Sequence, residues 1–145
     1  MLLFKKKFLE QIKRGEKTQT IRFWKHRRVS PGQRSYIPGI GYIDIVSVEQ
    51  VELARLTDED ALLDGFPSAR SLRKEIKTLY PADMRKKMIP FKICFSIYPP
   101  QEQEKMRLER LLKKQEQEQN KQRQGQEQYE RVRKTLDKLL NLIDS

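Results

Sequence analysis

Hydrophobic and polar residues alternate in several short stretches of the first hundred residues. The clearest case is the segment 89–98, where the alternation is typical of a strand with one buried face. The apolar positions of this segment are Phe91, Ile93, Phe95 and Ile97. Short apolar stretches predict further strands at 1–7 and 17–24, and two more within 34–56 that are split by a Pro-Gly turn.

Apolar residues spaced three or four apart predict three short helices, in 6–15, 56–66 and 67–81. Thr57 and Ser68 are suited to begin the second and third helices, because a hydroxyl there accepts a hydrogen bond from a free backbone N–H. A glycine follows the end of each of the first two helices.

The predicted strands outnumber the helices, and they are short and separated by turns. This pattern favours an α+β domain over residues 1–99, a small and mostly antiparallel β-barrel decorated by helices. The pair Pro99-Pro100 closes the domain.

Residues 100–145 form a different segment, rich in Gln, Glu, Lys and Arg, and we expect a C-terminal helical extension there. Near its end, apolar residues recur at alternating spacings of three and four: Tyr129, Val132, Leu136, Leu139 and Ile143. This row covers about two heptads of a possible short coiled coil. Either the apolar end folds back on the domain, or residues 126–143 bind a protein partner or a second copy. Gly125 is a candidate position for a bend.

The chain has 145 residues and a formal net charge of +11. Residues 1–34 contain 11 Lys and Arg against two acidic residues, so nearly all of the excess positive charge lies there. Concentrated positive charge favours polyanions through counterion release, and nucleic acid is the usual one. A basic surface that only keeps the protein in solution is the alternative interpretation.

Cysteine and histidine are too few for several common types of site. The single Cys94 excludes an intrachain disulfide, and with the single His26 it cannot make a zinc site of the usual kind. We therefore expect neither a metal nor a cofactor. No apolar run is long enough for a membrane span, and the charged N-terminus does not resemble a secretory signal, so we predict a cytoplasmic protein that does not interact with membranes.

The stretch GEKTQTIR, which leads into Phe23 and Trp24, carries several polar groups on one predicted face. In a strand, Thr18, Thr20, Arg22 and Trp24 point to the same side, and Lys17 lies at the entrance to it. Such a face is often only solvated, since threonine favours strands. However, a guanidinium can grip a phosphate with two hydrogen bonds, and an indole offers a surface on which a base can stack. We interpret this face as one wall of a nucleotide-sized pocket.

A basic loop follows this strand, and its cations are candidates for contacts with nucleic-acid phosphates. The candidate residues are Lys25, His26, Arg27, Arg28 and Arg34.

Asp64 falls in the last turn of a predicted helix, where a carboxylate is mildly unfavourable unless a cation meets it. If Lys17 is that cation, then Lys17, Thr20 and Asp64 converge. Such a trio could hydrolyse an amide, with threonine as nucleophile and a lysine of lowered pKa as base. The same groups could equally bind a base without any chemistry.

The segment GEKTQTIR resembles the Gly-x-Lys-x-x-x-x-Arg signature of the ASCH (activating signal cointegrator homology) domains, which belong to the PUA-like superfamily. The segments SPGQR, GYIDIVSVEQV, LLDGF, LYP and IPFKICFSI agree with that family in order, so the resemblance spans roughly residues 1–98. It implies a β-barrel with a cleft beside the motif and a role with RNA, nucleotides or modified nucleosides.

One bacterial branch of the family hydrolyses N4-acetylcytidine with a lysine, a threonine and a glutamate. These positions fall on Lys17, Thr20 and Asp64, the last with a side chain one methylene shorter. The leading prediction is binding of RNA, a nucleotide or a modified nucleoside. The alternatives are an amidohydrolase of N4-acetylcytidine, and an adaptor that uses its helical tail.

Overall fold

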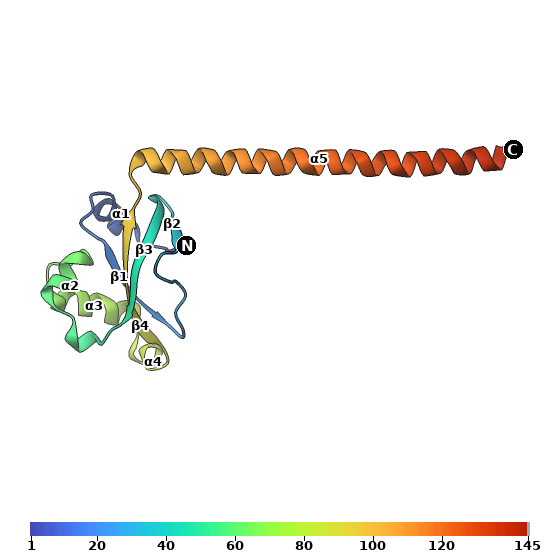
Figure 1. Cartoon of the computed structure of the whole chain (residues 1–145). Helices are drawn as coiled ribbons and strands as arrows, with labels where there is room; N and C mark the ends of the chain where they lie inside the picture. Colours follow the sequence, from blue (N-terminus) through green and yellow to red (C-terminus); the bar gives the residue numbers. More distant parts are fainter. Residues whose placement is uncertain (145) are drawn as a thin grey trace. The chain divides into compact units, whose positions relative to one another are not determined.

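The chain divides at Pro99 into two units, the first comprising Met1–Pro99 and the second beginning at Pro100. The structure is a computed structural model and describes residues 1–144. Figure 1 shows a sheet with helices packed beside it in the first unit and one long helix in the second.

The first unit is built on a four-stranded antiparallel sheet. Its strands are β1 (Gln19–Trp24), β2 (Arg34–Ile37), β3 (Gly41–Gln50) and β4 (Ile89–Ile97). They lie in the order β1-β4-β3-β2, with β1 and β2 at the two edges. The predicted α+β class with antiparallel strands is confirmed.

The predicted strand at residues 1–7 is wrong. Helix α1 (Lys6–Lys13) begins inside that segment, and the residues before it form no strand. Leu2 donates one backbone hydrogen bond to the carbonyl of Tyr36 in β2, at 3.0 Å. Leu2 is held mainly by burial in the core rather than by a ladder of hydrogen bonds.

The other predicted helices are present as α2 (Asp58–Leu63) and α3 (Ala69–Leu79). The expected caps are confirmed, since Thr57 and Ser68 each form a capping box at the start of their helix. Two short elements were not predicted, the 3₁₀ turn η1 (Leu53–Arg55) and α4 (Ala82–Arg85).

Two apolar clusters make up the core, and β1 contributes to both. Phe91, Ile93 and Phe95 of β4 pack with residues of α1, β2 and β3 in the larger cluster. Ile21 and Phe23 of β1 point the other way and pack against α2 and α3. The alternation of β1 thus leaves Thr20 and Arg22 on the face toward the N-terminal segment, where Arg22 bonds to Leu3. Gln19 lies on the opposite face with Ile21, and its Nε2 donates to the carbonyl of Asp60 in α2.

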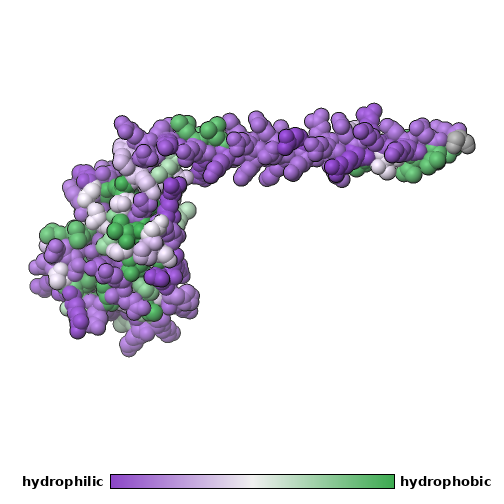
Figure 2. Space-filling view, viewed as in Figure 1, coloured by the Kyte–Doolittle hydropathy of each residue, from purple (hydrophilic) through white to green (hydrophobic). Residues whose placement is uncertain are grey.

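The second unit is helix α5 (Pro100–Asp144), so the predicted helical extension is confirmed. Gly125 does not interrupt it. The apolar row near its end is exposed, from Tyr129 (63%) to Ile143 (78%). Figure 2 shows hydrophobic side chains near both ends of a helix that is hydrophilic in between. Self-association through this row stays a prediction. None of the described helices has an apolar stretch that could cross a bilayer.

Two glycines give a matched pair of alanine substitutions with opposite expected effects. Gly65 ends α2 with φ of +88°, a conformation that costs a residue with a Cβ about 1–2 kcal/mol. A Cβ there would also lie 2.5 Å from Oε1 of Gln11. We expect Gly65→Ala to lower the free energy of unfolding by about that amount, measured by urea unfolding with Trp24 fluorescence.

Gly125 lies inside α5, and a Cβ there meets nothing within 4 Å. Gly125→Ala is therefore expected to stabilise the helix by about 0.5–1 kcal/mol, seen as increased helicity by circular dichroism during heating. Equal effects of the two substitutions would contradict the assigned backbone conformation of Gly65.

Candidate functional site

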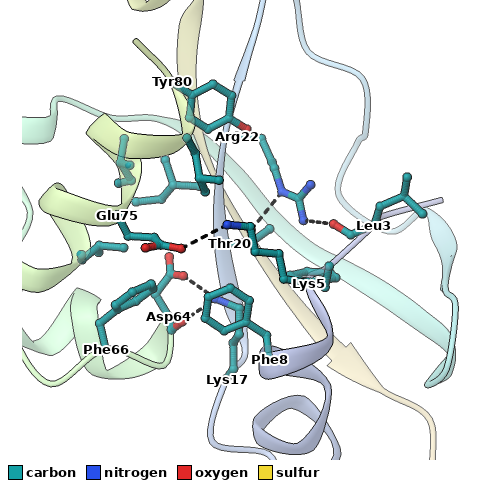
Figure 3. A pocket seen from close by; sticks show the side chains of 15 residues that line it. Leu3, Lys5, Phe8, Lys17, Thr20, Arg22, Asp64, Phe66, Glu75 and Tyr80 are labelled. Atoms are coloured by element: carbon teal, nitrogen blue, oxygen red, sulfur yellow. Dashed lines mark hydrogen bonds and ion pairs between the residues drawn. The ribbon is translucent and has the colours of Figure 1, made fainter. Parts of the chain in front are cut away.

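A pocket of about 270 Å³ opens beside β1, between the N-terminal segment with α1 on one side and α3 with the residues that follow α2 on the other. Figure 3 shows side chains from these elements pointing toward one another. Leu3, Phe4, Phe8, Phe66 and Tyr80 contribute much of the apolar lining. The polar lining residues are Lys5, Lys17, Thr20, Arg22, Asp64 and Glu75.

Lys17 and Asp64 form a buried ion pair at the base of this pocket. The two residues are only 2% and 4% exposed. The Lys17 ammonium donates hydrogen bonds to Oδ1 and to the main-chain oxygen of Asp64. Asp64 directly follows α2, so Lys17 neutralises both the carboxylate and the partial negative charge of the helix end.

Aromatic rings surround the Lys17 ammonium on its remaining sides. Its Nζ lies 4.6 Å from the ring centroid of Phe8, 5.7 Å from that of Phe66 and 5.9 Å from that of Phe4. At these distances the negative faces of the rings attract a cation. The cage holds the ammonium in place where water is largely excluded.

Burial and the ion pair act in opposite directions on the two pKa values. Burial lowers the pKa of Lys17 and raises the pKa of Asp64, because each charged form loses hydration. The attraction between the two charges opposes both shifts. Gln19 adds a further bond, since its Nε2 donates to Oδ2 of Asp64 at 3.4 Å and to the carbonyl of Asp60 at 3.1 Å.

Arg22 is held by neutral groups. Its Nε donates to Oγ1 of Thr20 at 3.0 Å, and its Nη2 donates to the carbonyl of Leu3 at 2.6 Å. The guanidinium carbon lies 4.7 Å from the ring centroid of Phe4. Burial lowers the pKa of Arg22. Among the described residues, no group hydrogen-bonds to Nη1, so this donor is available to a ligand.

Glu75 is a lining residue that the sequence analysis missed. It projects from α3, accepts a hydrogen bond from Nζ of Lys7 at 3.0 Å and lies 3.6 Å from Nζ of Lys5. The hydrogen bond from Lys7 lowers the pKa of Glu75, which keeps the carboxylate ionised. The signal was present in the sequence, because Glu75 shares one helix face with Leu72, three residues before it, and Leu79, four after it.

The structure brings Lys17, Thr20, Arg22 and Asp64 together in one pocket. It does not bring Trp24 there. Trp24 shares the face of β1 with Thr20 and Arg22, but it packs against Phe91, with ring centroids 5.9 Å apart. Each residue of a strand advances the chain by about 3.3 Å, so the indole lies some 7 Å beyond Arg22.

Thr18 also lies outside the pocket lining, just before β1 begins. Its backbone joins two elements: its N–H donates to the carbonyl of Leu63 at 2.9 Å, and its carbonyl accepts from Phe95 at 3.0 Å. The role of Thr18 is therefore to fix the entrance of β1 between α2 and β4.

The predicted phosphate-binding residues are exposed and lie outside the pocket lining: Lys25, His26, Arg27, Arg28 and Arg34. Arg28 lies over the ring of Trp24 at 5.9 Å. Within residues 1–144, none of the five takes part in an ion pair. The charges of Lys25, Arg27 and Arg28 are thus open to an external anion. Arg34 lies 5.9 Å from the ring centroid of Tyr42 and 5.7 Å from that of Tyr98.

The arrangement suits recognition better than hydrolysis in this conformation. Lys17 Nζ is bonded to Asp64, and no hydrogen bond joins it to Thr20 among the described residues. The hydroxyl of Thr20 instead accepts from Arg22. A lysine acting as general base would have to lose its proton and reach that hydroxyl.

Solved structures of other proteins resemble this fold. An ASCH domain from Lactobacillus crispatus JV V101 matches with a TM-score of 0.53 and 16% identity, over 61% of this chain and 69% of that one. Hypothetical protein PH0355 matches with a TM-score of 0.55 and 20% identity, over 66% of this chain and 95% of that one. No protein-family model and no curated protein matches the chain significantly. The expected resemblance to ASCH domains is confirmed at the level of the fold.

Proposed function

We propose that this ASCH-like domain binds RNA, a nucleotide or a modified nucleoside, with the base entering the pocket beside β1. The observation that carries the proposal is the lining of that pocket. Aromatic rings stand beside a guanidinium with a free donor, Arg22, and an ionised acceptor, Glu75. A nucleobase offers a π-face to the rings and both hydrogen-bond acceptors and donors at its edges.

The size of the pocket supports a small ligand. Its volume of about 270 Å³ lies just below the range of about 300–1,000 Å³ that is usual for drug-sized ligands. A pocket of this volume matches a ligand of the size of a base or a single nucleoside. A longer RNA would extend out of the pocket and place its phosphates on exposed cations, for which the unpaired residues of the loop 25–28 are candidates.

A titration of the full-length protein with single nucleosides tests the proposal. We expect chemical-shift changes at the backbone amides of Thr20, Phe66 and Tyr80, and none in α5. The panel contains the four common ribonucleosides and N4-acetylcytidine, with ribose as the control. Binding of ribose as tight as that of any nucleoside would contradict base recognition.

A second candidate function is hydrolysis of the acetyl amide of N4-acetylcytidine. The lowered pKa of the buried Lys17 favours it, because a lysine must be neutral to act as a base. Water would supply the hydroxyl of acetate, and cytidine would leave with the proton. The same titration separates the two functions: release of cytidine and acetate means hydrolysis, whereas shifts without release mean binding alone.

A third candidate, an adaptor, is motivated by α5. Its exposed apolar row offers a surface to a protein partner or a second copy. The candidate does not exclude the first, since the row and the pocket belong to different units of the chain.

A further inference from the structure

Helix α3 carries a stripe of four cations on the side opposite the pocket. Their spacing of three, four and seven residues places them on one face of the helix: Arg70, Arg73, Lys74 and Lys77. The residues of α3 that line the pocket, such as Leu72 and Ile76, point the other way. One helix thus separates the pocket from a second, purely basic surface.

The four cations of this stripe have no acidic partner. No ion pair involves them within residues 1–144, whereas Lys5 and Lys7 across the pocket both meet Glu75. Each of the four also has two like-charged neighbours three or four residues away. Such neighbours repel each other and destabilise a helix, so the arrangement weakens α3 unless an anion is bound.

The stripe also has a shape that suits an anion. A shallow hollow lies between its side chains, lined by the four cations and Thr78 and by no acidic group. Arg73 is fixed there, because its Nη1 donates to the carbonyl of Leu56 at 3.0 Å. Its other donors, together with the exposed Arg70, Lys74 and Lys77, remain available.

We infer that the stripe on α3 binds the phosphate backbone of RNA. This inference rests on the proposed RNA binding and adds a second contact surface to it. A phosphodiester chain suits the stripe because it carries one charge per nucleotide and needs no apolar contact. A protein interface usually has an apolar centre, and a membrane-binding helix has an exposed apolar face. The apolar face of α3 is instead buried in the core.

The test uses the full-length protein and three fluorescent probes. Two have about 20 nucleotides, a single-stranded RNA and an abasic sugar-phosphate oligomer, and the third is a poly-glutamate peptide with the same number of charges. The variant Lys74→Gln/Lys77→Gln removes two exposed charges of the stripe and retains good helix formers. The control Lys113→Gln/Lys114→Gln removes the same charge from exposed positions of α5. Anisotropy gives the affinity of each protein between about 50 and 200 mM salt.

We expect the stripe variant to lose affinity for both probes, whereas the control keeps it. Two lost phosphate contacts make the slope of log K against log salt shallower by about 1.4. If the variant and the wild type bind equally at 1 M salt, this difference in slope makes the affinity of the variant about 25-fold lower at 0.1 M salt. Unchanged circular dichroism verifies that α3 still forms.

Three results separate this inference from the proposed function. Equal losses in the stripe variant and the control would overturn the stripe as a site. Tighter binding of a poly-glutamate peptide than of RNA with the same number of charges would overturn RNA as its partner. If RNA and the abasic oligomer bind equally well and both depend on the stripe, base recognition fails while the inference stands.

Discussion

Replacing Lys17 by methionine is expected to lower the free energy of unfolding of the domain by about 3–5 kcal/mol, the usual cost of leaving one charge of a buried pair alone. Methionine has nearly the length of the lysine stem, so the substitution removes the charge with little loss of volume. Asp64, 4% exposed, would lose the one cation that hydrogen-bonds to it within residues 1–144. The aromatic cage of Phe4, Phe8 and Phe66 carries no positive charge and would not stabilise the unpaired carboxylate of Asp64.

The effect of Lys17→Met should depend on pH in a defined direction. Burial raises the pKa of Asp64 above its usual value of 3.8, and the ammonium of Lys17 opposes that shift. Without the ammonium this opposition is lost, so the pKa of Asp64 in the folded variant rises further. The folded variant then binds a proton more tightly than the unfolded chain does. Its destabilisation is complete above the folded-state pKa and diminishes as the pH falls through it.

Urea unfolding followed by Trp24 fluorescence measures both effects, at about pH 7.5 and about pH 5.5. Lys13→Met, at an exposed position of α1, is the matched control and should change stability by less than about 0.5 kcal/mol. The double variant Lys17→Met/Asp64→Asn should recover a large part of the loss, since it removes the unpaired charge. A double variant no more stable than Lys17→Met would mean that Lys17 stabilises the fold through its stem and the aromatic cage.

Local patterns in the sequence were sufficient for most elements of the fold. Alternation identified β4, and the hydroxyls of Thr57 and Ser68 marked the starts of α2 and α3. These features depend on residues within one turn or one strand. The prediction of an N-terminal strand was wrong because an apolar stretch does not show whether a partner strand is available. Of residues 1–5, only Leu2 forms a backbone hydrogen bond to β2.

The site depends on contacts over long distances in the chain. Lys17 and Asp64 are 47 residues apart, and their pairing could be proposed only from the need of a carboxylate at a helix end for a cation. The strand period correctly placed Thr20 and Arg22 on one face with Trp24. It could not show that Trp24 lies beyond the pocket and packs against Phe91, because a period gives the face of a residue and not its position along the cleft.

The basic stripe of α3 could not be predicted from the net charge of its segment. Residues 35–99 contain nine basic and nine acidic residues, and this net charge of zero indicates no anion site there. Net charge over a segment averages the faces of its helices. Because α3 turns its one acidic residue, Glu75, toward the pocket, its opposite face is left purely basic.

Arg22→Lys is expected to weaken nucleoside binding by about 10- to 100-fold while preserving the positive charge. The guanidinium bonds Thr20 and Leu3 through two nitrogens and keeps Nη1 for the ligand. One ammonium cannot reach all three positions, since it lacks the planar fork of arginine. Loss of a hydrogen bond to a charged group corresponds to about 1.5–3 kcal/mol, which sets the size of the effect.

Isothermal titration with the nucleoside that gives the largest chemical-shift changes measures the affinity of the Arg22→Lys variant. Arg14→Lys, at an exposed arginine paired with Glu16, is the control and should bind like the wild type. A urea unfolding curve shows whether the variant remains folded. Wild-type affinity in folded Arg22→Lys would show that charge alone attracts the ligand, and the pocket would then lack the directional recognition that the free Nη1 implies.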